Sequence, residues 1–277
     1  MGKPGAIDYY WVIFMDLAQK AELAARLLTV RSAVARDFLP LSESLPDTVL
    51  PGTGWLEREM LPTLVLLPAV GKANALLRAE KLALALELSF LAGRVHDRTA
   101  AAEPVNGRAI LAGDYLYTKS ALTLTDCGFD GWLGKVGRVL ARRSEARRQR
   151  LDWRERAFVP EAEKFALLPK ENAEGISLAA AMAAEAAGMT QKAADAYAGF
   201  GFYLGILQGI SLYGYKWSAA AEEAVDAARG ALLHIPCLLE AAEQMLLAKL
   251  ISEEREECRW CGERERFERP QMIGSNG

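Results

Sequence analysis

Cysteine and histidine are both scarce in this sequence, which contains four cysteines and two histidines in 277 residues. The cysteines Cys127, Cys237, Cys258 and Cys261 are too few and too scattered for a disulfide framework. Cys258 and Cys261 form one C-x-x-C pair, but a structural zinc site needs four ligands and no second pair is present. We therefore interpret them as an exposed thiol pair at a helix end, with a redox role or metal sharing across a dimer as the alternatives.

Charge imbalance and strand patterns are also nearly absent. The formal net charge of −3 gives no general attraction to nucleic acid. No N-terminal stretch combines a basic region, an apolar region and a small-residue cleavage site, so we expect a cytoplasmic protein. Apolar residues recur at helical spacing through most of the chain. The sequence, which is 51% hydrophobic, therefore predicts a folded all-α protein.

The predicted helices form one domain, 1–261, followed by a polar tail, 262–277. They cover 7–38, 56–70, 73–96, 108–126, 130–158, 174–187, 191–215, 217–234 and 237–257, with a loop at 39–54, a hinge at 99–107 and a partly irregular stretch at 159–170. The segments 73–97 and 191–215 are too apolar to face water on any side. We expect them to face each other across a central cavity.

The stretch 196–215 carries no charge over 20 residues, which is long enough to span a bilayer. Gly201, Gly205 and Gly209 have the spacing that lets helices approach closely. However, the glycines and tyrosines lower its hydrophobicity, and its flanks lack a positive-inside pattern. We favour a buried central helix over a membrane span.

The run from Lys135 to Arg156 holds nine basic and three acidic residues. It would suit phosphate, an acidic partner or an anionic membrane surface. The only aromatics nearby are Trp132 and Trp153, which argues against a nucleic-acid stacking platform. The simpler interpretation is a solvated helix face.

Two short segments frame the hinge at 99–107, namely VHDRT at 95–99 and ILAGDY at 110–115. They resemble an aspartate-rich motif and the Leu-Ala-Gly-Asp-Tyr/Phe segment that follows it in the polyprenyl synthetase family, the trans-isoprenyl diphosphate synthases. Further on, LGILQ at 204–208 resembles the family's Leu-Gly-x-x-x-Gln helix. The resemblance runs from about residue 50 to 215 and implies an isoprenoid-synthase-type helical bundle around a central cavity.

The chain lacks most of the carboxylates that the family uses. In the family, carboxylates on two facing helices hold magnesium ions, which bind an allylic diphosphate. Only Asp97 remains of the first motif, because Arg98 and Ala101 stand where the family has aspartates. The second motif is lost, since 211–215 contain no aspartate. One carboxylate cannot hold a three-metal cluster, so the resemblance implies no metal site.

The family's other diphosphate site is altered as well. Its Gly-Gly-Lys-Arg-x-Arg-Pro motif corresponds to LEREMLP at 56–62, where only Pro62 and the charge of Arg58 remain. A family Lys-Thr motif falls near 172–174, again without the lysine. Arg58 and Gln208 are the substrate-binding candidates that the resemblance leaves.

His96, Asp97 and Asp114 are the remnant candidates for catalysis. Each also has a structural interpretation. His96 and Asp97 would close the helix end or pair with Arg94 or Arg98. Asp114 would lie in the first turn of a helix and satisfy its free N–H groups.

Within the family, the chain resembles the small, non-catalytic component of two-component heptaprenyl and hexaprenyl diphosphate synthases. That resemblance implies a non-catalytic or regulatory subunit of isoprenoid or polyprenyl biosynthesis, including the biosynthesis of quinone side chains. Such a subunit needs no cofactor and forms a homodimer or a heterodimer with an active polyprenyl diphosphate synthase.

Two alternatives stay open. One is an active prenyltransferase that rebuilds a magnesium site from Asp97, Asp114 and other carboxylates and condenses an allylic diphosphate with isopentenyl diphosphate. The other is a protein that binds a prenyl or other lipid chain in the helical cavity, with peripheral membrane contact.

Overall fold

The structure is a computed structural model that describes residues 15–42, 59–100, 107–153, 156, 158–215, 219–235 and 238–247. Every regular element in these ranges is a helix, which confirms the all-α prediction. The tail 262–277, Arg58 and the thiol pair Cys258 and Cys261 lie outside the described residues. The division into one domain and a tail therefore stays a prediction.

The helices are α1 (Leu17–Ser42), α3 (Met60–Leu66), α4 (Ala73–Ala100), α5 (Gly107–Asp126), α6 (Leu133–Asp152), α7 (Glu161–Leu168), α8 (Glu174–Ala186), α9 (Gln191–Leu212), α10 (Ala219–Leu232) and α11 (Leu239–Ala242). Shorter turns form 3-10 helices at Leu67–Ala69 and Asp130–Trp132 and π-helices at Pro169–Ala173 and Glu243–Leu247.

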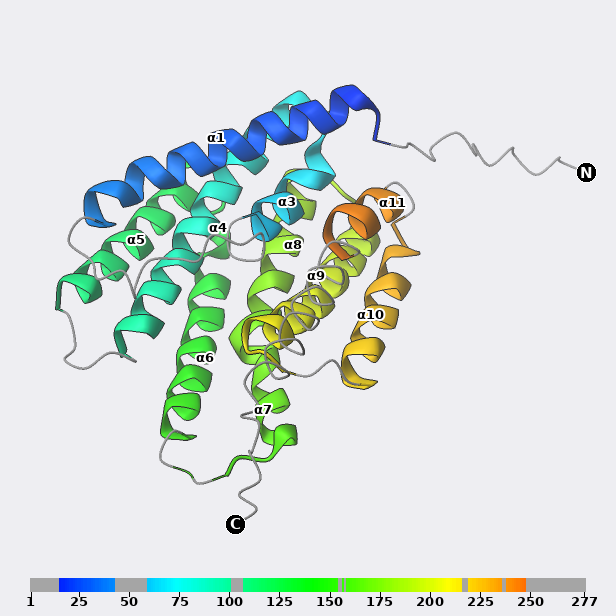
Figure 1. The fold of residues 1–277 in the computed structure, drawn as a ribbon. Coiled ribbons are helices and arrows are strands. Elements are labelled where there is room, and N and C mark those ends of the chain that lie inside the picture. Colours follow the sequence, from blue (N-terminus) through cyan, green and yellow to red (C-terminus); the bar gives the residue numbers. More distant parts are fainter. Residues whose placement is uncertain are drawn as a thin grey trace, which may run out of the picture.

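The bundle has two sides that α3 joins. On one side α4 packs on α5, and on the other α9 packs against both α8 and α10 (Figure 1). α1 crosses one end of the bundle and packs on α4 and α3, whereas α6 packs against the π-helix Pro169–Ala173 and α8. The two sides meet at α3, which contacts both α4 and α8.

The short helix α3 is held by its surroundings, because seven residues are too few to form a stable helix alone. All of its side chains are buried. The hydroxyl of Tyr197 on α9 donates a hydrogen bond of 2.7 Å to the carbonyl oxygen of Leu64. Burial raises the pKa of Tyr197, so this buried donor keeps its proton.

Gly201, Gly205 and Gly209 of α9 lie at close helix contacts, as predicted, whereas Gly199 and Gly214 do not. A Cβ atom added at Gly205 would lie 2.6 Å from the Cα of Ala173, and one at Gly201 would lie 2.7 Å from the Cβ of Ala180. Only glycine allows α9 to come this near its neighbours. Among the described residues, no helix combines the length and apolarity that crossing a bilayer requires.

The structure moves several predicted boundaries. α4 runs on to Ala100, into the predicted hinge, and α1 runs on to Ser42, into the predicted loop. The stretch 159–170 is irregular only as far as Pro160, because α7 begins at Glu161. Pro169 then begins a π-helix, since proline has no N–H to continue the regular ladder.

Candidate functional site

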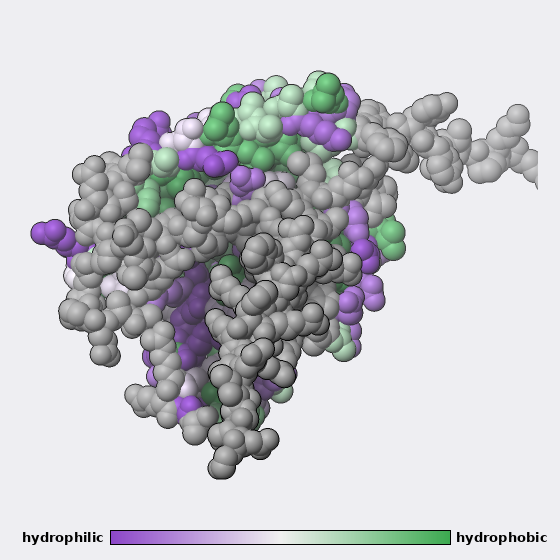
Figure 2. Space-filling model, in the orientation of Figure 1, coloured by the Kyte–Doolittle hydropathy of each residue, from purple (hydrophilic) through white to green (hydrophobic). Residues whose placement is uncertain are grey.

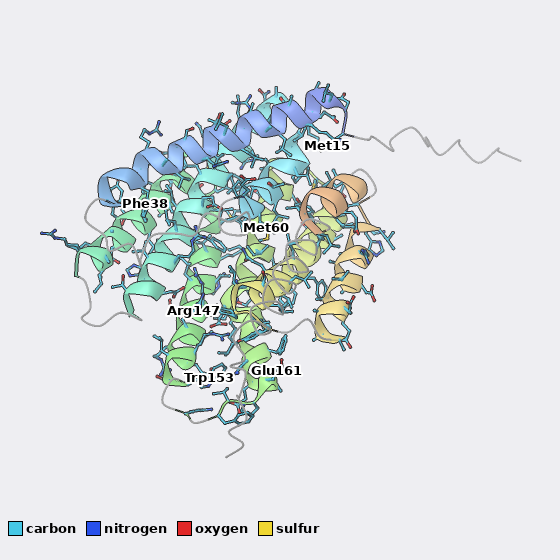
Figure 3. All side chains as sticks on the ribbon, in the orientation of Figure 1. Met15, Phe38, Met60, Arg147, Trp153 and Glu161 are labelled. Carbon is cyan, nitrogen blue, oxygen red and sulfur yellow. The ribbon has the colours of Figure 1, made fainter. Side chains whose placement is uncertain are left out.

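Three arginines of α6 point into the bundle, where Arg147 is labelled in Figure 3. Arg143, Arg147 and Arg150 lie on one side of the helix because they are four and three residues apart. Their side chains are 11%, 23% and 20% exposed. Arg148, on the outer side, is 75% exposed. The prediction of a solvated basic face is therefore wrong for the inner side of α6 and right for the outer side.

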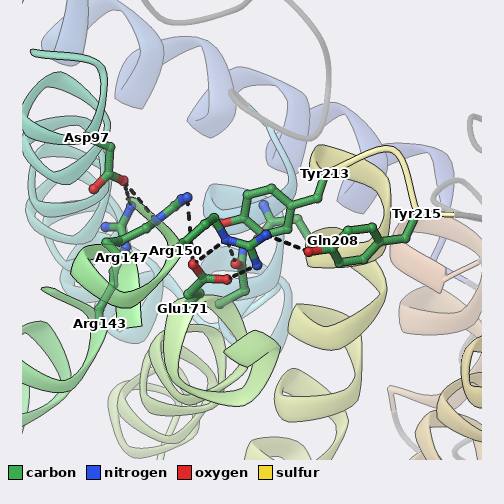
Figure 4. Close-up of polar contacts among 9 residues, drawn as sticks. Asp97, Arg143, Arg147, Arg150, Glu171, Gln208, Tyr213 and Tyr215 are labelled. Atoms are coloured by element: carbon green, nitrogen blue, oxygen red, sulfur yellow. Dashed lines mark hydrogen bonds and ion pairs between the residues drawn. The ribbon is translucent and has the colours of Figure 1, made fainter. Parts of the chain in front are cut away.

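Asp97, in the last turn of α4, binds two of these arginines (Figure 4). Arg143 Nη2 donates a hydrogen bond of 2.9 Å to Asp97 Oδ2, and Arg147 Nε lies 3.2 Å from the same oxygen. The guanidinium of Arg143 reaches Asp97 across Gly93, where any Cβ atom would overlap it. The predicted pairing of Asp97 with Arg94 is wrong, because the partners of Asp97 are arginines of α6. The alternative partner, Arg98, has a side chain outside the described residues.

Glu171, in the π-helix, is the second carboxylate of the cluster, and its side chain is fully buried. Arg150 donates to both carboxylate oxygens of Glu171, with a distance of 2.7 Å from Nε to Oε1. Arg147 Nη1 lies 4.0 Å from Glu171 Oε1. Burial lowers the pKa of Arg150, but its hydrogen bonds to Glu171 and Tyr215 outweigh this and raise the pKa above its usual value. Arg150 and Glu171 thus form a buried, bidentate ion pair.

Two tyrosines that follow α9 close the cluster from the other side of the bundle. The guanidinium of Arg150 lies 3.9 Å from the centroid of the Tyr213 ring, a cation–π contact. Arg150 Nη1 also donates to the hydroxyl oxygen of Tyr215. Burial raises the pKa of Tyr213, so its ring stays neutral. The arginines of α6 therefore lie between the ends of α4 and α9 and contact side chains at both ends.

Gln208 on α9 is buried. Its Oε1 atom accepts a hydrogen bond of 3.4 Å from Asn172 Nδ2, and Asn172 Oδ1 lies 3.5 Å from the hydroxyl of Tyr213. Gln208 is therefore linked through Asn172 to Tyr213 of the cluster. Its role in substrate binding stays a prediction.

His96 and Asp114 lie next to each other where α4 packs on α5, and they are not part of the cluster around Asp97. His96 Nε2 lies 3.2 Å from Asp114 Oδ1, and the imidazole stacks on Tyr117 with ring centroids 5.6 Å apart. The imidazole fits because Gly113 has no side chain to occupy its place. The prediction that Asp114 lies in a first helical turn is wrong, because α5 begins at Gly107 and Asp114 falls in its third turn.

The described residues do not fit the magnesium cluster of the family. Within the ranges that the structure describes, no three His, Cys, Asp or Glu side chains come together as metal ligands. Asp97 and Glu171 are each bound by guanidinium groups. Magnesium prefers several oxygen ligands in octahedral geometry, and these two carboxylates are already neutralised.

Three solved structures show what the fold is similar to. A geranylgeranyl pyrophosphate synthetase from the archaeon Geoglobus acetivorans is 19% identical, with a TM-score of 0.59 over 83% of this chain and 99% of that chain. A decaprenyl diphosphate synthase from Rhodobacter capsulatus is 16% identical, with a TM-score of 0.59 over 84% and 98%. A geranyl diphosphate synthase small subunit from Antirrhinum majus is 14% identical, with a TM-score of 0.57 over 82% and 100%.

The chain therefore has the all-α fold of the prenyl diphosphate synthases. At these identities the likeness establishes the fold alone. No protein-family model matches the chain, and no curated protein sequence matches it.

Proposed function

We propose that this chain is a non-catalytic subunit of isoprenoid biosynthesis that acts by pairing with another chain of the same fold. The fold supports a place in that chemistry, and one protein of similar structure is itself a small subunit. The observation that carries the proposal is the double engagement of Asp97 by Arg143 and Arg147.

The reasoning rests on the chemistry of allylic diphosphates. Ionisation leaves negative charge on the departing diphosphate, and metal ions supply the compensating charge in the family. Here Asp97 is neutralised by two guanidinium groups, and Glu171 is neutralised by Arg150. A metal ion would have to displace these contacts and then find further ligands. The arginines thus stabilise the fold of the site at the expense of metal binding.

The outer face of α5 offers the surface for pairing. Leu111, Tyr115 and Leu122 are exposed, and their spacing places them in one stripe along the helix. A stripe of large apolar side chains on a helix surface is typical of an interaction site. The predicted partner is α5 of a second copy, packed antiparallel.

The antiparallel arrangement follows from the order of residues along α5. Leu111 and Leu122 lie at equal distances from the middle of the helix, so each would meet the other in the paired chain. Arg108 near the start and Asp126 at the end would also lie opposite each other. Unlike charges at the two ends favour the antiparallel pair over the parallel one.

The test of the function is an assay of product formation. We expect the purified chain, incubated with an allylic diphosphate, isopentenyl diphosphate and magnesium, to form no chain-elongated product. An intact synthase assayed in parallel serves as the positive control. Mixing the two proteins should change the product length or the lifetime of the synthase. Product formed by the chain alone would contradict the proposal and favour the active prenyltransferase.

A further inference from the structure

The side of α1 that faces away from the bundle is uncharged along most of its length. α1 packs on α4 and α3, and its residues Leu23, Val30 and Phe38 are buried. The opposite side carries an exposed row of residues, which we call the α1 stripe: Leu17, Ala21, Ala24, Ala25, Leu28, Ser32 and Ala35. Leu17 is 85% exposed and Leu28 is 63% exposed. Figure 2 shows hydrophobic residues along the upper side of the molecule, where α1 crosses the bundle. The stripe is about 27 Å long, since each helical residue adds about 1.5 Å.

Basic side chains border the α1 stripe on both edges. With 3.6 residues per helical turn, Lys20 and Arg31 fall along one edge and Arg36 along the other. All three are exposed. Arg31 pairs with Glu59 at 3.0 Å, whereas Lys20 and Arg36 form no ion pair with any described residue. Side chains of this length can lie along an apolar surface and hold their charge at its border.

The exposed acid next to the stripe, Asp16, is used by the helix itself. Asp16 Oδ1 accepts a hydrogen bond of 2.8 Å from Gln19 N, and Gln19 Oε1 accepts one of 3.2 Å from Asp16 N. This reciprocal pair caps the start of α1, where the helix dipole also favours a negative charge. The sequence directly before the cap, at 9–14, is Tyr-Tyr-Trp-Val-Ile-Phe and lies outside the described residues. An uncharged aromatic run therefore leads into the helix that carries the stripe.

These features indicate what covers the α1 stripe. Tryptophan and tyrosine are enriched where a membrane meets water, because each ring has an apolar body and a polar end. A helix that lies in the plane of a membrane surface has an apolar face with Lys or Arg beside it. A second copy of the chain fits less well, since pairing through α1 would bring the basic edges of two helices together.

We propose that α1 docks on an anionic membrane surface, with the α1 stripe against the lipid and its basic edges on the headgroups. The run at 9–14 enters the same surface. Anionic headgroups attract each basic residue that lies near them. The inference goes beyond the proposed function and does not depend on it, because neither the stripe nor its borders belong to the cluster around Asp97.

Vesicle flotation with the full chain tests the apolar part of the contact. We expect the wild type to float with vesicles of equal parts phosphatidylcholine and phosphatidylglycerol, and to bind pure phosphatidylcholine vesicles at least about tenfold more weakly. Leu28→Glu puts a charge in the middle of the stripe and should raise the dissociation constant for the mixed vesicles by about tenfold or more. Leu233→Glu is the matched control, because Leu233 is 66% exposed and lies beyond α10. It should float as the wild type does.

A second pair of variants tests the basic edges. Arg36→Gln should raise the dissociation constant for the mixed vesicles by about fivefold. Arg148→Gln removes the same charge from α6, where Arg148 is 75% exposed, and should leave the dissociation constant unchanged. Equal losses in these two variants would show that the chain binds by overall charge and not through α1, and would overturn the proposal.

Two further results would also overturn it. One is a wild type that does not float with the mixed vesicles, and the other is a Leu28→Glu chain that floats as well as the wild type. If Leu28→Glu instead halves the mass of the chain in light scattering without vesicles, the stripe belongs to a second copy and the proposal is wrong. None of these results bears on product formation, so the proposed function stands or falls by its own assay.

Discussion

Arg143 and Asp97 are joined by a hydrogen bond of 2.9 Å that links the middle of α6 to the end of α4. The link depends on Gly93, whose missing side chain lets the guanidinium cross α4. The Asp97 carboxylate is therefore bound by arginine side chains of a neighbouring helix. The stability of the site, and the ligands that it can bind, follow from this pairing of Asp97 with arginine.

Loss of the Asp97 carboxylate should destabilise the fold. Asp97→Asn would leave Arg143 and Arg147 partly buried without their shared anion, which should lower the free energy of unfolding by about 1–3 kcal/mol. Urea unfolding measures the change. Asp195→Asn, at an exposed residue of α9, is the control and should alter stability by less than about 0.5 kcal/mol. Equal effects of the two substitutions would mean that the arginines do not need Asp97.

A methyl group at Gly205 should push α9 away from its neighbour. Its Cβ atom would lie 2.6 Å from the backbone of Ala173, so Gly205→Ala should lower stability by about 1–3 kcal/mol despite the better helix propensity of alanine. Gly137→Ala is the matched substitution on α6, where a Cβ atom would meet open space. It should raise stability by about 0.5–1 kcal/mol. Thermal unfolding compares the two, and a stable Gly205→Ala protein would rule out the close contact.

Stability should fall between about pH 4.5 and 7 because of Glu87. Burial raises the pKa of Glu87 from 4.5 to about 7, although Arg94, whose Nη2 atom lies 3.9 Å from Glu87 Oε2, lowers it. The folded chain holds this proton over a range in which the unfolded chain has lost it. The resulting contribution is complete below pH 4.5 and is lost as the pH rises through 7.

Replacing the carboxyl group of Glu87 should remove this pH dependence of stability. Glu87→Gln cannot ionise, so above pH 7 it should be more stable than the wild type, by up to about 3 kcal/mol. Below pH 4.5 the two proteins should unfold alike. Unfolding curves at a series of pH values measure the difference. A wild type and variant that respond identically to pH would show that Glu87 is not the titrating group.

A charge on the α5 stripe should prevent self-association. Leu111 is 69% exposed on α5, and Leu233 is 66% exposed beyond α10, on the opposite side of the bundle (Figure 1). We expect Leu111→Glu to convert a dimer into a monomer, whereas Leu233→Glu leaves the dimer intact. Light scattering after size-exclusion chromatography measures the mass. A wild-type monomer, or a dimer that survives Leu111→Glu, would exclude the α5 surface.

The fold could be predicted from the sequence, because the fold depends on local patterns of residues. Helical spacing of apolar residues, and glycines in an otherwise uncharged segment, predicted an all-α bundle. The prediction that 73–97 and 191–215 face no water is wrong, because Leu77 and Leu212 are 52% and 41% exposed. The errors arose where a contact crosses a long stretch of chain. Arg143 lies 46 residues after Asp97, and Glu171 lies 21 residues after Arg150, so neither partnership has a local signature.

One local signal for the site was present in the sequence. Arg143, Arg147 and Arg150 have the spacing of one helix side, and Ala146 and Trp153, which are buried, lie close to them in the chain. This pattern allowed the prediction that the side of α6 with these arginines faces the interior of the protein. The position of Asp114 was missed because nothing between Gly107 and Asp114 breaks the helix, so its first turn lies earlier.

The most direct test of the account is a magnesium titration followed by thermal unfolding. We predict that millimolar magnesium raises the melting temperature of the wild-type chain neither alone nor in addition to pyrophosphate, because Asp97 is bound by Arg143 and Arg147. A rise that requires magnesium and disappears in Asp97→Asn would show that the carboxylate still serves a metal, and would contradict the account.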